Sequence, residues 1–310
     1  MKTKTTLFLI TAAAFTSLQS VSFGVSLSAY PASFEIDTFR LNVTGAPGAA
    51  FVVEWSTNLT NWQPGWTNLI PAEGSMVIID PMILSAKFYR VKPFTNGILN
   101  SITITSSTNS TMIQNRRDLF ADATTNLIAS GNPTLSPERV AVGIGRNDSD
   151  QLCAVTRPFI VFQQTAALPA GANIIAAELV MNVDRKSGAG LGGTIPVNDN
   201  QTYVRVVEAY PSDPANIAPS DFGLISRNEA YSEKRYFRDV VEGQRLVVPL
   251  RSAAFGQLTN AVPFTYSLMD GHELEMVDHF QVINGHNHHF FAPDTAGQSM
   301  PQIRIVYLQN

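Results

Sequence analysis

Residues 157–183 read Arg-Pro-Phe-Ile-Val-Phe-Gln-Gln-Thr-Ala-Ala-Leu-Pro-Ala-Gly-Ala-Asn-Ile-Ile-Ala-Ala-Glu-Leu-Val-Met-Asn-Val, and this stretch decides the fold class. Residues 159–162 form a short apolar run of strand type. Residues 168–171, Leu-Pro-Ala-Gly, are typical of a turn, because proline fixes φ and glycine permits positive φ. Residues 174–183 are apolar again. Alanine, leucine and methionine would favour helix there, but a run of about ten residues between turn signals indicates a buried strand. We expect the central hairpin of a β-sandwich, which favours binding or structure over catalysis.

The composition also favours an all-β protein. The 310 residues carry a formal net charge of −4, and 15% of them are charged. That balance argues against nucleic-acid binding, which requires a basic stripe. It is also too little charge for a disordered chain. Many Ser, Thr, Asn, Gly and Pro residues separate short apolar runs, as in sandwiches of short strands.

Residues 1–24 have the features of a secretory signal peptide. Lys2 and Lys4 precede an apolar run at 6–14, and Ser22 and Gly24 are small residues at the cleavage-determining positions. A transmembrane anchor would need ~20 apolar residues, and polar residues between 16 and 20 interrupt this run. No later segment is apolar enough to span a bilayer. We expect a protein that is secreted, extracellular or held at the cell surface.

Cys153 is the only cysteine, so the chain cannot form an intramolecular disulfide. We expect it to be a buried, small apolar residue beside the strand at 159–162.

Residues 30–92 are expected to form a small β-sandwich module. Strands are predicted at 39–43, 50–55, 76–79 and 88–91, with turn clusters between them. All three tryptophans lie in this region, at Trp55, Trp62 and Trp66. They either pack in the core and rim of the module or form an exposed aromatic platform for sugars.

Three short motifs connect this region to a known kind of module. They are Glu54-Trp-Ser-Thr57, Asn58-Leu-Thr-Asn-Trp62 and Phe88-Tyr-Arg-Val91. With them the region resembles a small β-sandwich module of secreted Verrucomicrobia and Planctomycetes proteins. The resemblance implies an extracellular accessory module, with Trp62 as a packing residue.

Residues 93–100 are predicted to be a linker, and residues 101–310 a second, jelly-roll-like β-sandwich. The long loop 209–239 is expected to hold a short helix near 226–235. The nine strands expected in this domain are 102–105, 140–144, 159–162, 174–183, 203–208, 246–250, 264–268, 280–283 and 303–307.

The second domain resembles the DNRLRE-type β-sandwich domains and the related carbohydrate-binding modules associated with alginate. The residues that carry this are Arg157-Pro-Phe-Ile-Val-Phe162, Leu168 to Leu179 with Ala177 in place, and Pro301-Gln-Ile-Arg-Ile-Val-Tyr307. Gln163 departs from the Asp common in those domains. The resemblance implies an acidic polysaccharide as ligand. Basic side chains would hold its carboxylates through charge-assisted hydrogen bonds, and the residues best placed are Arg205, Lys234, Arg235 and Arg238.

All five histidines fall in one tract: His272, His279, His286, His288 and His289. Imidazole with nearby carboxylates suits zinc or another transition metal. His286, His288 and His289 are the candidate metal ligands, on a loop expected between strands ending at 283 and starting at 290. A solvated polar turn and a ligand-binding rim remain as the other interpretations, because the spacing fits no established metal motif.

Oxygen-rich loops at 147–150 and 198–200 either form ordinary turns or hold a structural calcium ion. The only candidate cofactor is a structural calcium or zinc ion. We predict a secreted, non-catalytic protein that binds extracellular polysaccharide as a surface or matrix component. The alternatives are a structural or adhesive protein with a protein partner, and a metal-dependent polysaccharide enzyme that uses the histidines.

Overall fold

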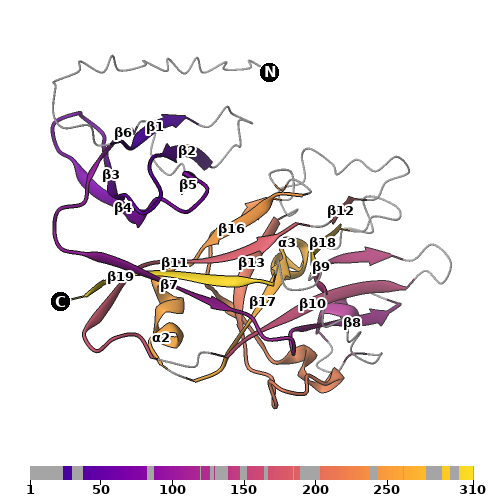
Figure 1. The fold of residues 1–310 in the computed structure, drawn as a ribbon. Coiled ribbons are helices and arrows are strands. Elements are labelled where there is room, and N and C mark those ends of the chain that lie inside the picture. Colours follow the sequence, from indigo (N-terminus) through magenta and orange to yellow (C-terminus); the bar gives the residue numbers. More distant parts are fainter. Residues whose placement is uncertain are drawn as a thin grey trace, which may run out of the picture. The chain divides into compact units, whose positions relative to one another are not determined.

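The structure is a computed structural model that describes residues 24–29, 38–81, 87–118, 120–125, 129, 139–146, 152–163, 167–183, 185–188, 203–236, 240, 243–260, 262–276, 288–293 and 300–309. The chain divides into two compact units, Met1–Phe94 and Thr95–Asn310 (Figure 1). The division falls within the segment 93–100. Across these described ranges, no helix has the length and hydrophobicity needed to cross a membrane.

The first unit contains two antiparallel three-stranded sheets. One has the order β1 (Ser26–Ala29), β2 (Thr38–Thr44), β5 (Ser75–Pro81), and the other β4 (Gln63–Leu69), β3 (Ala50–Ser56), β6 (Phe88–Pro93). The four strands expected here are present, and β1 and β4 are additional. Strand β4 was missed because Pro64 and Gly65 suggest a turn, yet both are tolerated in an edge strand.

The indole rings of this unit are covered by its own side chains. The Arg90 guanidinium lies 4.2 Å from the centroid of the Trp62 ring, and the Lys87 ammonium lies 4.9 Å from that of Trp55. Trp66 packs against the buried core of the unit. These contacts favour packing over an exposed platform for sugars.

The second unit is a sandwich of a nine-stranded and a four-stranded sheet (Figure 1). The larger sheet has the order β12 (Arg185–Gly188), β18 (His288–Pro293), β9 (Arg139–Arg146), β10 (Cys153–Phe162), β17 (Phe264–Asp270), β13 (Tyr203–Ala209), β14 (Ile225–Ala230), with β8 (Thr111–Arg117) against β10 and β15 (Arg235–Tyr236) against β13. The smaller sheet has the order β16 (Arg245–Pro249), β11 (Ala172–Asn182), β19 (Gln302–Gln309), β7 (Leu99–Thr105). The prediction of an all-β sandwich fold is confirmed.

Residues 157–183 form two strands but not a hairpin. Strand β10 pairs with β8, β9 and β17, whereas β11 pairs with β16 and β19 in the other sheet. The turn after Leu168 therefore carries the chain from one sheet to the other. Both runs are apolar because Phe162 of β10 and Leu179 of β11 belong to the same core. The expectation of a strand rather than a helix at 174–183 is confirmed.

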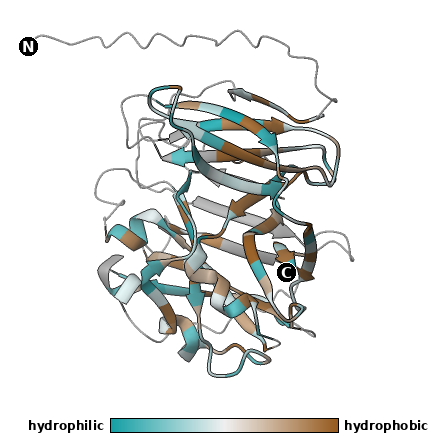
Figure 2. Ribbon diagram, turned by 90° about the vertical axis from the view of Figure 1, so that its left-hand side faces the viewer, coloured by the Kyte–Doolittle hydropathy of each residue, from teal (hydrophilic) through white to brown (hydrophobic). Residues whose placement is uncertain are grey.

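The central strands of the nine-stranded sheet are buried on both faces. Its inner face contributes Ile160, Phe162 and Val206 to the core between the sheets. Its outer face contributes Phe159 and Val207 to a second core, which contains Phe222 of the 3-10 helix η1 (Pro219–Gly223) and Ala123 of α1 (Phe120–Thr125). Figure 2 shows hydrophobic residues, in brown, on strands of both units. Cys153 is buried, as expected.

The helix expected near 226–235 is absent, because residues 225–230 form β14 and pair with β13. Hydrogen bonding to the sheet thus outweighs the local helix propensity. The described residues also form the short helices η3 (Ser252–Ala254), α2 (Phe255–Leu258) and α3 (Gly271–Glu275). The strand expected at 280–283 lies outside the described residues.

Candidate functional site

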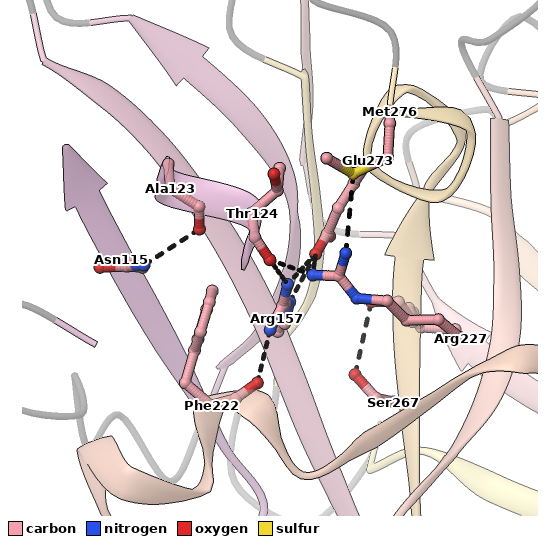
Figure 3. A network of polar contacts seen from close by, with 10 residues as sticks. Asn115, Ala123, Thr124, Arg157, Phe222, Arg227, Ser267, Glu273 and Met276 are labelled. Atoms are coloured by element: carbon pink, nitrogen blue, oxygen red, sulfur yellow. Dashed lines mark hydrogen bonds and ion pairs between the residues drawn. The ribbon is translucent and has the colours of Figure 1, made fainter. Parts of the chain in front are cut away.

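Arg157 is the centre of a polar network on the outer face of the nine-stranded sheet (Figure 3). Every residue of β10 is buried, and the Arg157 side chain is 1% exposed. Its Nε donates to Glu273 Oε1 at 2.5 Å, its Nη1 to the Phe222 carbonyl at 2.5 Å and its Nη2 to the Thr124 carbonyl at 2.8 Å. The guanidinium also lies 3.7 Å from the centroid of the Phe222 ring. Arg157 therefore joins β10, α1, η1 and α3.

The network satisfies the carboxyl-terminal end of α1. The last carbonyls of a helix have no partner within it and carry partial negative charge. Asn115 Nδ2 donates to the Ala123 carbonyl at 3.0 Å, and Arg157 and Arg227 both donate to that of Thr124 (Figure 3). Side chains from β8, β10 and β14 thereby fix a helix of only six residues.

Glu273 is the buried anion of the network. Its side chain is 0% exposed, and its Oε1 atom contacts Arg157 and lies 3.6 Å from Arg227 Nη2. Burial raises the pKa of the Glu273 carboxyl, and the charges of Arg157 and Arg227 oppose that rise. Asp270 caps α3 by accepting from the His272 backbone N–H at 2.9 Å, and this places Glu273 in the first turn facing β10.

Arg227 is the part of the network that solvent reaches. Its side chain is 32% exposed. Its Nη2 donates to the Thr124 carbonyl and lies 3.6 Å from Glu273 Oε1, and its Nη1 lies 3.7 Å from the weak acceptor Met276 Sδ. Since Arg157 and Glu273 compensate each other, Arg227 carries the positive charge that remains at the surface of the network.

A pocket of about 390 Å³ opens beside Arg227. Tyr210, which is 51% exposed, contributes an aromatic ring to the pocket. The lining residues are Thr124, Thr125, Arg157, Tyr210, Gly223, Ile225, Ser226, Arg227 and Asn228. The pocket thus combines an exposed ring, a partly exposed guanidinium, hydroxyls and an amide. Such a set can bind a polar ligand and orient its hydroxyl and anionic groups.

Two of the basic residues proposed from the sequence lie elsewhere on the same unit, around the buried Tyr203 ring. The Lys234 ammonium lies 4.4 Å, and the Arg205 guanidinium 5.8 Å, from the ring centroid. Lys234 also pairs with Glu275 at 3.0 Å, and the Tyr203 hydroxyl donates to that carboxylate at 2.7 Å. Neither Arg205 nor Lys234 lines the pocket.

Arg235 has a structural position. It is buried, and its Nε donates to the Val247 carbonyl at 3.0 Å, with a second bond from Nη2. These bonds join β15 of the larger sheet to β16 of the smaller one. Arg238, the fourth basic candidate, lies outside the described residues.

The candidate metal ligands are only partly described. His288 and His289 begin β18 and pair with Gly188 and Ser187 of β12, so this part of the tract is strand rather than loop. His286 and His279 lie outside the described residues. His272 is buried, and its Nδ1 lies 2.9 Å from Asp270 Oδ1. The described residues contain no group of three or more His, Cys, Asp or Glu side chains arranged to hold a metal.

Sequence reasoning missed Arg227, Tyr210 and the role of Glu273. The available signal was Arg157, the one charged residue in a strand that is otherwise mostly apolar. A buried arginine requires an anion, which the sequence alone does not locate. Arg227 and Tyr210 lie in the long polar loop region, where nothing in the local pattern distinguishes them.

No protein-family model matches the chain, and no curated protein matches it. Among solved structures, it is similar to a chain in the "Structure of infectious bursal disease virus Gx strain". That chain is 11% identical at a TM-score of 0.13, over 92% of this chain and 76% of the viral one. A similarity at this TM-score carries no argument about fold or function.

Proposed function

We propose that this protein is a secreted, non-catalytic component of the cell surface or matrix that binds an acidic extracellular polysaccharide in the Arg227 pocket. The observation that carries the proposal is the combination of the partly exposed Arg227 guanidinium with the exposed Tyr210 ring in one pocket. The signal peptide expected at residues 1–24 and the resemblance to alginate-associated modules support the same function.

The lining chemistry fits a sugar acid better than a neutral, apolar ligand. An aromatic ring offers a flat apolar surface to the face of a sugar. Arg227 can donate two hydrogen bonds to a carboxylate or sulfate group, a geometry for which guanidinium is well suited. Ser226 and Asn228 add a hydroxyl and an amide for the sugar hydroxyls.

The same lining favours binding over hydrolysis. Glycoside hydrolysis uses a pair of carboxyl groups on either side of the scissile bond. None of the described lining residues is a carboxylate or a histidine. Glu273 is the nearest acid in the network, and it is fully buried against Arg157.

The experiment is a glycan array probed with the full mature chain, followed by titration calorimetry with the tightest ligand. We expect uronic-acid or sulfated polysaccharides among the ligands. Because the array carries the two classes as separate glycans, it shows whether the pocket binds carboxylate or sulfate groups. Tyr210→Ala and Arg227→Gln should each weaken binding about tenfold or more, since each removes a directional contact.

Lys92→Ala is the matched control, because it removes an exposed positive charge from the other unit. It should leave the affinity unchanged. Binding that Tyr210→Ala and Arg227→Gln do not affect would contradict the pocket. If no glycan is bound at all, the structural or adhesive alternative replaces the proposal.

A further inference from the structure

The edge strands of the sheets differ in how they are protected. An exposed strand edge pairs readily with another chain, and proteins prevent this with charges, prolines, bulges or very short strands. Among the described strands, each edge strand has such a device except β7. Asp80 and Pro81 lie in β5, Pro64 in β4, and Arg90 and Lys92 in β6.

The second unit shows the contrast within one domain. The edge strands with charged residues are β8 (Arg116, Arg117), β12 (Arg185, Lys186), β14 (Arg227, Glu229), β15 (Arg235) and β16 (Arg245, with Pro249). Strand β7 reads Leu-Asn-Ser-Ile-Thr-Ile-Thr, seven residues with neither charge nor proline. The other edge strand without them, β1, has four residues.

Strand β7 is also regular. Its pairing with β19 runs from Leu99↔Leu308 to Thr105↔Gln302 without a shift in register. The pairings β11–β19, β13–β14 and β3–β4 each contain one. In the described part of the chain, β19 is the only strand that pairs with β7.

The opposite edge of the same sheet is closed by specific contacts. Arg235 covers the Val247 carbonyl of β16, and Arg251 N donates to the Tyr231 carbonyl at 2.7 Å. A bridge between Ser232 and Leu250 adds to this closure. On the β7 side, the comparable contact is the bridge between Ser106 and Phe162, beyond the end of the strand.

We propose that β7 is a self-association edge, through which two copies of this chain pair antiparallel about Ile102. A twofold axis through Ile102 places Ile102 opposite its own copy and Ser101 opposite Thr103 of the other chain. Pairing of this kind joins the two four-stranded sheets into one continuous sheet.

The strand is complementary to itself. Ile102 is only partly buried against the core, and pairing puts it against its copy. Ser101 and Thr103 are exposed on the outer face. A serine directly opposite a threonine on the neighbouring strand stabilises a sheet by hydrogen bonding between the hydroxyls. No like charges meet at any rung. Ile98, which precedes the strand and is 74% exposed, offers further apolar surface.

The test is the mass of the full mature chain in solution, measured by light scattering and sedimentation across a range of concentrations. The wild type should form a dimer. Ser101→Lys with Thr103→Lys should weaken association about tenfold or more, because both cross-strand pairs then become Lys–Lys. Ser101→Glu with Thr103→Glu should do the same. A mixture of the two variants should form a heterodimer, since each rung then joins Lys to Glu.

Ser252→Lys with Ala253→Lys is the control, because it adds the same charges to exposed positions of η3 and should leave the dimer intact. A monomeric wild type overturns the proposal. So does a dimer that both double variants retain, or a mixture of the two that stays monomeric.

If the charged variants fail to fold, cysteine pairs provide a second measurement. Ser101→Cys mixed with Thr103→Cys should give a disulfide-linked dimer that neither variant gives alone, and its absence overturns the proposal. Cys153 is buried and contributes no background. The proposal does not depend on glycan binding, because the Arg227 pocket lies on the other sheet.

Discussion

Arg157 and Glu273 are 116 residues apart in the chain and form an ion pair whose side chains are 1% and 0% exposed. Breaking such a pair leaves a buried charge without compensation. We expect Arg157→Met and Glu273→Leu each to lower the free energy of unfolding by about 3–5 kcal/mol. The double variant should lose less than the sum, because no lone charge remains. Urea unfolding followed by circular dichroism measures this cycle, and strictly additive losses would contradict the coupling.

Glu54 should make the first unit sensitive to acid. Burial raises its pKa, but hydrogen bonds and charges from Lys92 and Arg90 outweigh burial and hold the pKa below its usual value of 4.5. The folded state therefore binds fewer protons than the unfolded state near this pH. Its stabilising contribution is present above about pH 4.5 and is lost as the pH falls through the folded pKa.

Tryptophan fluorescence isolates this effect, because Trp55, Trp62 and Trp66 all lie in the first unit. Urea midpoints of the wild type should decrease on acidification below the usual pKa of a glutamate. Glu54→Gln should flatten that part of the profile, whereas Glu233→Gln, in the second unit, should not change it. An unchanged profile in Glu54→Gln would count against the assignment.

Arg235→Ala and Lys234→Ala should differ although the residues are neighbours. Arg235 is buried and joins the two sheets through the Val247 carbonyl, so its loss should cost about 1–3 kcal/mol. Lys234 is about one-third exposed and forms a surface pair with Glu275, so its loss should cost less than about 1 kcal/mol. Thermal unfolding of the two variants decides this, and equal effects would refute the structural role of Arg235.

Three glycine-to-alanine variants should form a graded series. Gly97 has φ +127°, and an added Cβ would lie 2.5 Å from Leu308 Cδ1, so Gly97→Ala should cost about 1–3 kcal/mol. Gly171 has φ +79° with open space around it, so Gly171→Ala should cost about 1–2 kcal/mol. Gly256, in α2, has neither constraint, and Gly256→Ala should be neutral or stabilising by up to about 1 kcal/mol. Urea midpoints in a different order would contradict the backbone argument.

The fold class followed from the sequence because alternation and turn chemistry are local. Strands β3, β11 and β17 lie close to their expected bounds for this reason. The partners of the strands did not follow, since adjacency in the chain suggested a hairpin where β10 and β11 lie in different sheets. The register of long-range pairs depends on the whole core, which no local window contains.

The candidate site shows the same limit. Lys234 and Arg235 are adjacent and both basic, yet the Lys234 side chain is partly exposed and the Arg235 side chain is buried and donates to the Val247 carbonyl. Lys234 lies just before the two-residue strand β15, both of whose residues are buried, and so short a strand leaves no alternation to recognise in the sequence. Arg227 was hidden because its strand, β14, was expected to be a helix.

The rung between Leu99 and Leu308 has a mechanical consequence. Leu99 is the first residue of β7 and Leu308 lies near the end of β19, so the start of one strand and the end of the other lie side by side. Tension applied between the two ends loads this rung first and then opens β7 from β19 one rung at a time, like a zipper. A sheet pulled in this direction yields at low force, whereas shear along the strands would load all rungs together. Under such tension the unit would extend by releasing β7 first, and the loss of Ile104 would open this side of the core between the sheets.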